Sequence, residues 1–171
     1  MGALHVRAVV LPGAVERDLY VAGGCYVGPE DGCPRVITAG RFLAPPGGYF
    51  PGLAREIPAG ELPDAAEDEA RASGAWVKLI GDFPGPDGRL RANWPSDVLA
   101  EATRRVHALG GQVAMHVMTE PVIQAAIDAG ADSIEHGTGM MPDQINAMAA
   151  RGTAWVPTLT RGGAGPAVAF A

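Results

Sequence analysis

The sequence predicts an α/β fold built around a parallel sheet. Between residues 60 and 160 the same unit occurs four times: an amphipathic helical segment, a glycine and a short apolar strand. Helices that alternate with strands in this way connect parallel strands through crossovers. The strands are short and mostly apolar, which is typical of strands covered on both faces.

Each of the four units carries residues that start and stop a helix. Proline suits the first turn, where a backbone N–H has no partner to lose, and glycine is common just past the last turn. Between these points apolar residues recur at helical spacing, for instance at Leu99, Ala102 and Val106. The predicted helices begin near Pro63, Ser96, Pro121 and Pro142, and the strands that follow are 75–80, 112–116, 132–136 and 154–157.

Upstream of these units the pattern is less regular. Residues 15–21 and 35–39 read as two further strands, separated by a segment rich in glycine and proline. Residues 45–62 are predicted to form a long loop, and loops of that length are often functional. We expect one domain over residues 1–160, followed by a C-terminal tail over residues 161–171.

Composition excludes several classes of protein. The 171 residues are 47% hydrophobic, enough for one globular core, and include 24 glycines and 15 prolines, which predict long loops. The net charge is −6 without a cluster of basic residues, which argues against nucleic acid as a partner. Apolar runs have strand length and no signal peptide is recognisable, so we expect a cytoplasmic protein without a membrane span.

Three residues mark the ends of predicted strands. Lys78, His116 and His136 lie at or near the carboxyl ends of strands 75–80, 112–116 and 132–136, the edge where α/β folds gather ligands and catalytic groups. Lys78 is the one lysine among 13 basic residues, the others being arginine. Two imidazoles on neighbouring parallel strands are close enough to bind one ion, so the pattern favours a metal site.

Each of these residues also has an alternative interpretation. A histidine at the end of a strand is often a hydrogen-bonded structural residue, and Lys78 could extend its amine to solvent, act as a nucleophile or be carboxylated by carbon dioxide. His107 is expected on the surface, and His5 has no neighbour that suggests a role. Glu135 is expected to point away from His136 and to pair with an arginine.

Residues 129–137 (AGADSIEHG) closely resemble the sixth-strand signature of the amidohydrolase superfamily, in its imidazolonepropionase-like and Xaa-Pro-dipeptidase-like branch. Further segments resemble other strands of that barrel in the same order. They are 15–19 (VERDL, second strand), 34–41 (PRVITAGR, third), 76–79 (WVKL, fourth), 113–116 (VAMH, fifth) and 155–159 (WVPTL, seventh).

The resemblance implies a (β/α)8 TIM-type barrel and a metal-dependent hydrolase. In this family the fourth-strand lysine is carboxylated and bridges one or two divalent ions, usually zinc, and histidines of the fifth and sixth strands bind one ion. These roles transfer to Lys78, His116 and His136 as metal ligands. The implied reaction is the hydrolysis of a C–N bond in an amide, cyclic amide or dipeptide by a metal-activated hydroxide.

The chain also departs from the family pattern. The His-x-His pair of the first strand and the catalytic aspartate of the eighth are absent, so the resemblance implies about six of eight strands and no catalytic residue of that type. Tyr49 stands where relatives often have histidine after the third strand, and is a candidate for substrate binding. An incomplete sheet exposes its edges, so we expect self-association or a complementing chain. The alternative hypothesis is a non-catalytic, truncated remnant with at most a weak metal half-site.

Overall fold

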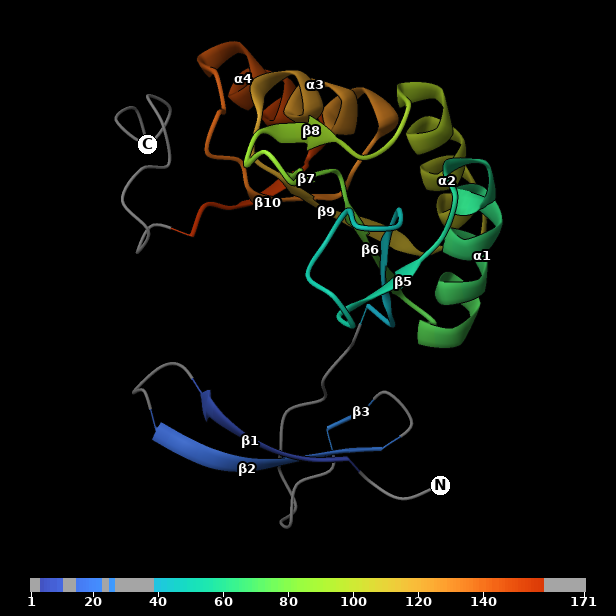
Figure 1. The fold of residues 1–171 in the computed structure, drawn as a ribbon, viewed down its shortest axis with the longest axis vertical. Coiled ribbons are helices and arrows are strands. Elements are labelled where there is room, and N and C mark those ends of the chain that lie inside the picture. Colours follow the sequence, from blue (N-terminus) through green and yellow to red (C-terminus); the bar gives the residue numbers. More distant parts are fainter. Residues whose placement is uncertain (1–3, 11–14, 23–24, 27–38, 159–171) are drawn as a thin grey trace. The chain divides into compact units, whose positions relative to one another are not determined.

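The computed structural model describes residues 4–10, 15–22, 25–26 and 39–158 of the chain. The chain divides into two compact units, residues 1–38 and residues 39–171 (Figure 1). None of the helices in the described part is long and apolar enough to cross a membrane.

The first unit is an antiparallel sheet of three strands in the order β1-β2-β3. The strands are β1 (Leu4–Val10), β2 (Val15–Ala22) and β3 (Cys25–Tyr26). The strand predicted over residues 15–21 is confirmed, but the resemblance of residues 15–19 to the parallel second strand of a barrel was misleading, because β2 pairs antiparallel with β1. Four residues separate β1 from β2, and a parallel connection needs a dozen or more.

The second unit contains a parallel sheet of six strands in the order β11-β10-β9-β6-β4-β5. This architecture matches part of a TIM-type barrel, as predicted from the sequence. The strands are β4 (Phe42–Ala44), β5 (Ala54–Glu56), β6 (Trp76–Ile80), β9 (Gln112–Val117), β10 (Ser133–His136) and β11 (Ala154–Val156).

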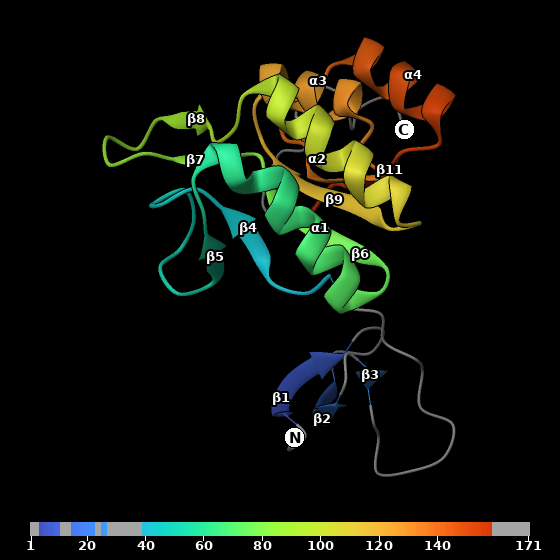
Figure 2. The ribbon, with the colours of Figure 1, turned by 90° about the vertical axis from the view of Figure 1, so that its right-hand side faces the viewer.

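The four predicted helices are confirmed, each within one residue of its expected start. They are α1 (Leu62–Ser73), α2 (Ser96–Ala108), α3 (Glu120–Ala129) and α4 (Pro142–Arg151). Consecutive helices contact one another, and together they form a layer on one side of the sheet (Figure 2). Crossover connections of one hand produce this arrangement, because each right-handed βαβ unit places its helix on the same face.

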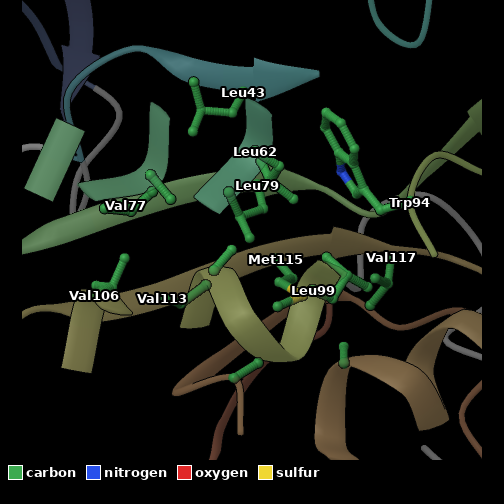
Figure 3. Packing of buried hydrophobic residues seen from close by; sticks show 14 of the residues in the cluster. Leu43, Leu62, Val77, Leu79, Trp94, Leu99, Val106, Val113, Met115 and Val117 are labelled. Carbon is green, nitrogen blue, oxygen red and sulfur yellow. The ribbon is translucent and has the colours of Figure 1, made fainter. Parts of the chain in front are cut away.

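The hydrophobic core lies between the helix layer and the sheet. Alternate residues of β6 and β9 are fully buried there, and Leu62, Leu99 and Val106 of the helices pack against them (Figure 3). The buried strand residues are Val77, Leu79, Val113, Met115 and Val117. Because side chains alternate along a strand, residues 78, 114 and 116 point to the opposite face of the sheet.

Three segments differ from the sequence prediction. The expected loop 45–62 contains β5 and a 3-10 turn at Ala59–Glu61, and β5 takes the outer place in the sheet beside β4. Of the predicted strand 35–39, residues 35–38 lie outside the described residues and Ala39 is not in a strand. A short hairpin, β7 (Asp82–Pro84) with β8 (Leu90–Ala92), follows β6. Strands of three residues are too short to show alternation in the sequence.

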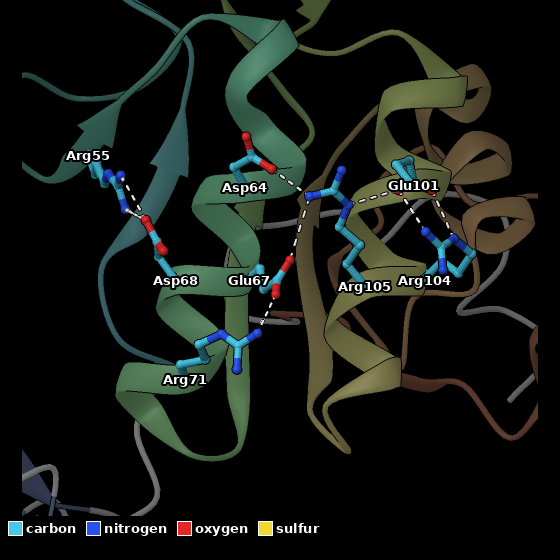
Figure 4. Close-up of polar contacts among 8 residues, drawn as sticks. All are labelled: Arg55, Asp64, Glu67, Asp68, Arg71, Glu101, Arg104 and Arg105. Carbon is cyan, nitrogen blue, oxygen red and sulfur yellow. Dashed lines mark hydrogen bonds and ion pairs between the residues drawn. The ribbon is translucent and has the colours of Figure 1, made fainter.

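Arginines cover the outer surface of α1 and α2 with ion pairs. Arg105 contacts Asp64, Glu67 and Glu101, and links the two helices (Figure 4). Arg104 contributes a further pair with Glu101. A guanidinium group reaches several carboxylates at once, here three, which suits arginine to such a network. Exposed pairs of this kind contribute at most about 1 kcal/mol each.

One carboxylate beneath this surface is nearly buried. Glu69 of α1 is 3% exposed and accepts hydrogen bonds from the Arg41 backbone N–H (3.0 Å), the Arg41 Nε (2.9 Å) and Arg55 Nη1 (3.2 Å). Burial by itself raises the pKa of Glu69. The hydrogen bonds from the two arginines lower that pKa by more than burial raises it, so the pKa of Glu69 lies below its ordinary value. The contact ties α1 to the residue that precedes β4.

We predict that Glu69→Gln lowers the free energy of unfolding by about 1–3 kcal/mol at pH 7. The reason is that the buried carboxylate loses its charge-assisted hydrogen bonds with Arg41 and Arg55. A carboxylate whose pKa is lower in the folded state stabilises the folded protein at pH values above its unfolded-state pKa. This stabilisation is lost as the pH falls through the folded-state pKa. The difference between the wild type and the variant in urea denaturation should therefore shrink below about pH 4. A difference of the same size at pH 3 and pH 7 would contradict the ion-pair explanation.

Candidate functional site

Three adjacent strands bring together Lys78, His116 and His136 toward the carboxyl ends of the sheet. Lys78 lies on β6, His116 on β9 and His136 at the end of β10. The imidazole centroids of His116 and His136 are 4.6 Å apart, and the rings meet edge to face at 71°. The structure thus places together the two histidines that were predicted as ligands.

His136 reaches this position through an unusual backbone conformation. Its partner in the register is Val117, whose side chain points into the core. His136 has a φ of +70°, a left-handed conformation that L-residues seldom adopt, and Gly137 follows with a φ of +57°. Its Nδ1 lies 2.7 Å from Thr158 Oγ1, and its carbonyl accepts a hydrogen bond from Trp155 Nε1 (3.0 Å). Such strain costs of order 1–3 kcal/mol and is typical of functional sites.

His116 has a buried nitrogen without a hydrogen-bond partner in the described part of the chain. That atom is Nε2, and buried polar atoms of this kind are rare in proteins. Burial, followed by the nearby His136 and Lys78, lowers the pKa of His116 to about 4. The ring is therefore neutral at pH 7 and offers a lone pair, as a metal ligand must.

Lys78 is mostly shielded from water and faces a carboxylate. Burial lowers the pKa of Lys78 to about 8, against the opposing effect of the Glu135 charge. Lys78 Nζ lies 3.9 Å from Glu135 Oε2, and Ser133 Oγ donates to Glu135 Oε1 at 2.7 Å. Sequence reasoning was wrong to pair Glu135 with an arginine. Because Glu135 aligns with His116 in the register, it lies on the same face of the sheet as His116 and Lys78.

A cleft of about 600 Å³ opens beside the two histidines. Its aromatic part is a cluster of Tyr49, Phe50 and Phe83, with ring centroids 5.0–5.1 Å apart. Tyr49, the residue proposed from the sequence, meets the His116 ring at 5.9 Å. The cleft is lined by Tyr49, Phe50, Phe83, Pro84, His116, Met118, His136 and Thr158. Sequence reasoning missed Phe50, Phe83, Pro84, Met118 and Thr158. Of these, Met118 directly follows β9 and Thr158 lies two residues beyond β11, positions that the predicted strand ends could have indicated.

Asp82 was also missed, and it fixes the loops of this edge. It is fully buried and accepts hydrogen bonds from the backbone N–H groups of Met118 (2.9 Å) and Thr119 (2.8 Å), and from the Thr119 hydroxyl (2.8 Å). It therefore connects the segment after β6 to the segment after β9. An aspartate two residues after an apolar strand was the available signal.

A smaller cavity of about 280 Å³ lies at the amino ends of the strands. There His107 Nε2 is 2.8 Å from Asp132 Oδ2, which also accepts the Val113 backbone N–H at 2.8 Å. This pair ties α2 to β9 and β10, at the other end of the strands from Lys78. His5 falls in β1, where only the backbone is described.

The donors at the candidate site are two imidazoles and one amine. Among the described side chains, no three from His, Cys, Asp and Glu gather closely enough to hold a metal ion. The orphaned Nε2 of His116 and the convergence of the two rings nevertheless fit a cation that prefers nitrogen donors, as zinc does. The residues thus match part of a ligand set.

Several solved structures of hydrolases share this fold. The chain superposes on an Aspergillus niger ochratoxinase with a TM-score of 0.64 at 20% identity, over 73% of this chain and 36% of that one. It matches a Xaa-Pro dipeptidase with a TM-score of 0.62 at 23% identity, over 74% and 36% of the two chains. The chain has the fold of part of an amidohydrolase barrel. A further structure described as an amidohydrolase gives a TM-score of 0.63 at 24% identity, over 74% and 37%.

Among curated proteins, the chain is 45% identical over 128 residues to an uncharacterized protein of Mycobacterium tuberculosis, Rv2915c. An uncharacterized protein of Mycobacterium bovis, Mb2939c, gives the same identity over the same length. The alignments span 74% of this chain and 35% of these relatives, so the chain covers about a third of their length. No protein-family model matches the chain.

We predict that Lys78→Met raises the free energy of unfolding of the metal-free protein by about 1–3 kcal/mol at pH 7. The folded-state pKa of Lys78 lies below that of the unfolded chain, so holding the ammonium charged at pH 7 destabilises the fold. The wild type should gain stability relative to the variant as the pH rises from about 8 to about 10. Urea denaturation of the wild type and the variant at pH 7 and at pH 10 measures the difference in stability and its change with pH. A variant that is less stable than the wild type at pH 7 would contradict the desolvation of Lys78.

Proposed function

We propose that Lys78, His116 and His136 are ligands of a divalent metal site, with zinc as the first candidate and one or two ions bound. The observation that carries this proposal is the convergence of His116 and His136, with the buried Nε2 of His116 lacking a partner among the described residues. Hydrolases of the same fold support it, since ochratoxinase, prolidase and Xaa-Pro dipeptidase structures match the chain. The proposed activity is hydrolysis of C–N bonds in amides, cyclic amides or dipeptides.

The chain's own residues have distinct tasks in this proposal. A divalent cation at the site supplies a Lewis acid for the carbonyl and for water. His116 presents a neutral imidazole, and Thr158 orients the His136 ring through its Nδ1 contact of 2.7 Å. Lys78, partly neutral because its pKa is about 8, is able to attack carbon dioxide and form a carbamate with loss of one proton. The carbamate provides the anionic ligand that an ammonium cannot provide.

A second candidate is a metal half-site without catalysis. The observation that favours it is the donor set: the described residues bring together two imidazoles and a lysine, with no group of three His, Cys, Asp or Glu. Loss of a general acid or base commonly reduces the rate by about 10²- to 10⁴-fold. Metal binding without hydrolysis of small amides would favour this candidate. A cytoplasmic location stays a prediction from the sequence.

Elemental analysis of the purified chain, dialysed against zinc and then manganese, tests the metal site. We expect about one ion per chain, lost in the His116→Ala/His136→Ala double variant because both nitrogen donors are removed. The matched control is His107→Ala, which removes a histidine at the opposite end of the strands and should retain the metal. Equal metal content in the wild type and the double variant would overturn the proposal. A screen with small amides then separates the hydrolase from the half-site.

We further propose that a second copy or a complementing chain covers the sheet edges. Among the described strands, β5 and β11 end the sheet order and have a neighbour on one side only. Val156 on β11 is 47% exposed. Edge strands with apolar side chains favour association. Light scattering at tens of micromolar should give a mass above that of one chain, and Val156→Lys should reduce it; a monomer would contradict self-association.

A further inference from the structure

We propose that the cleft beside His116 and His136 binds an uncharged apolar group of the substrate, an aromatic ring above all, and excludes a carboxylate. The cleft itself is defined by its lining residues and does not depend on a metal. Its role as a substrate subsite rests on the proposed hydrolase function, because the two histidines form part of its wall.

The aromatic cluster provides the contact surface for such a group. Phe50 and Phe83 meet edge to face at 5.0 Å, and Tyr49 joins them with a centroid 5.1 Å from each. Phe50 is 56% exposed, an unfavourable state for a phenyl ring that an apolar ligand would relieve. Aromatic rings prefer the edges and faces of other rings, so a ligand ring gains more here than an aliphatic group of the same area.

The charge of the lining determines what the cleft excludes. Its eight lining residues include no Asp, Glu, Lys or Arg. A carboxylate that enters loses hydration and meets no cationic side chain among these residues, which makes burial unfavourable. Two of the polar groups in the lining, Thr158 Oγ1 and His136 Nδ1, already contact each other at 2.7 Å. At this subsite the lining therefore favours a neutral group of the ligand over an acidic group of the same shape.

The walls are also held in place before a ligand binds. Phe83 follows Asp82, whose carboxylate accepts the Met118 and Thr119 N–H groups, so two walls are joined through one buried side chain. Asn93 Nδ2 donates to the carbonyls of Gly48 (3.0 Å) and Ile80 (2.9 Å), and so secures the loop that carries Tyr49 and Phe50. A preformed cleft loses less entropy on binding than a flexible one.

Binding of three matched probes to the full chain, measured by ligand-observed NMR with and without zinc, tests the proposal. The probes are N-acetyl-L-phenylalaninamide (neutral, aromatic), N-acetyl-L-phenylalanine (the same ring with a carboxylate) and N-acetylglycinamide (no ring). We expect the neutral aromatic amide to bind about tenfold or more tightly than either of the others in metal-free protein. Equal binding of all three, or tighter binding of the carboxylate without metal, would overturn the proposal.

Two variants show where the probe binds. Phe50→Ala removes an exposed ring of the cleft, so the fold is not at risk, and should weaken binding of the neutral aromatic amide about threefold to tenfold. Leu53→Ala is the matched control, since Leu53 is 61% exposed and lies outside the lining. A loss in Leu53→Ala equal to that in Phe50→Ala would contradict the assignment of the cleft.

The outcomes separate this inference from the proposed function. Selective binding of the neutral ring without any metal uptake would support the cleft and overturn the metal site. Metal uptake that depends on His116 and His136, together with no preference among the probes, would support the metal site and overturn the cleft. Both results come from different measurements on the same protein.

Discussion

The constraint on which the structure depends is the alternation of side chains along two central parallel strands, β6 and β9. Val77, Leu79, Val113, Met115 and Val117 point toward the helices and are fully buried. The residues between them must therefore face the other side of the sheet, where Lys78 and His116 lie. A shift of one residue in register would place the lysine and the histidine in the apolar core. Packing of the core thus determines the position of the site.

The site concentrates features that are unfavourable for the fold alone. His136 has a left-handed backbone, His116 has a buried nitrogen without a partner among the described residues, and the amine of Lys78 is largely desolvated. Each feature favours a ligand, because a ligand would use the lone pairs and relieve the desolvation. Natural proteins retain such features where function requires them, while the surrounding core supplies the stability.

Rigid links connect the strands of this edge to the loops beyond them. Asp82 accepts a hydrogen bond from the backbone N–H of Met118, which lies 36 residues further along the chain. Asn93 donates a hydrogen bond to the carbonyl of Gly48, which lies 45 residues earlier. These contacts place the aromatic cluster next to the histidines. The apolar cleft and the proposed metal site both include His116 and His136, so ligand selection and the proposed chemistry would occur at adjoining surfaces. Hydrogen bonds of these buried polar side chains fix the positions of the loops more specifically than apolar packing alone would.

The sequence was sufficient to predict the four helix–strand units and to place Lys78, His116 and His136 on three of the strands, because periodicity, proline and glycine act locally. It could not show that residues 15–21 pair antiparallel with β1, that β5 forms inside an expected loop, or that Glu135 faces Lys78. Pairing partners, the left-handed turn at His136 and the aromatic cleft all depend on contacts between residues far apart in the chain, and no local pattern encodes them.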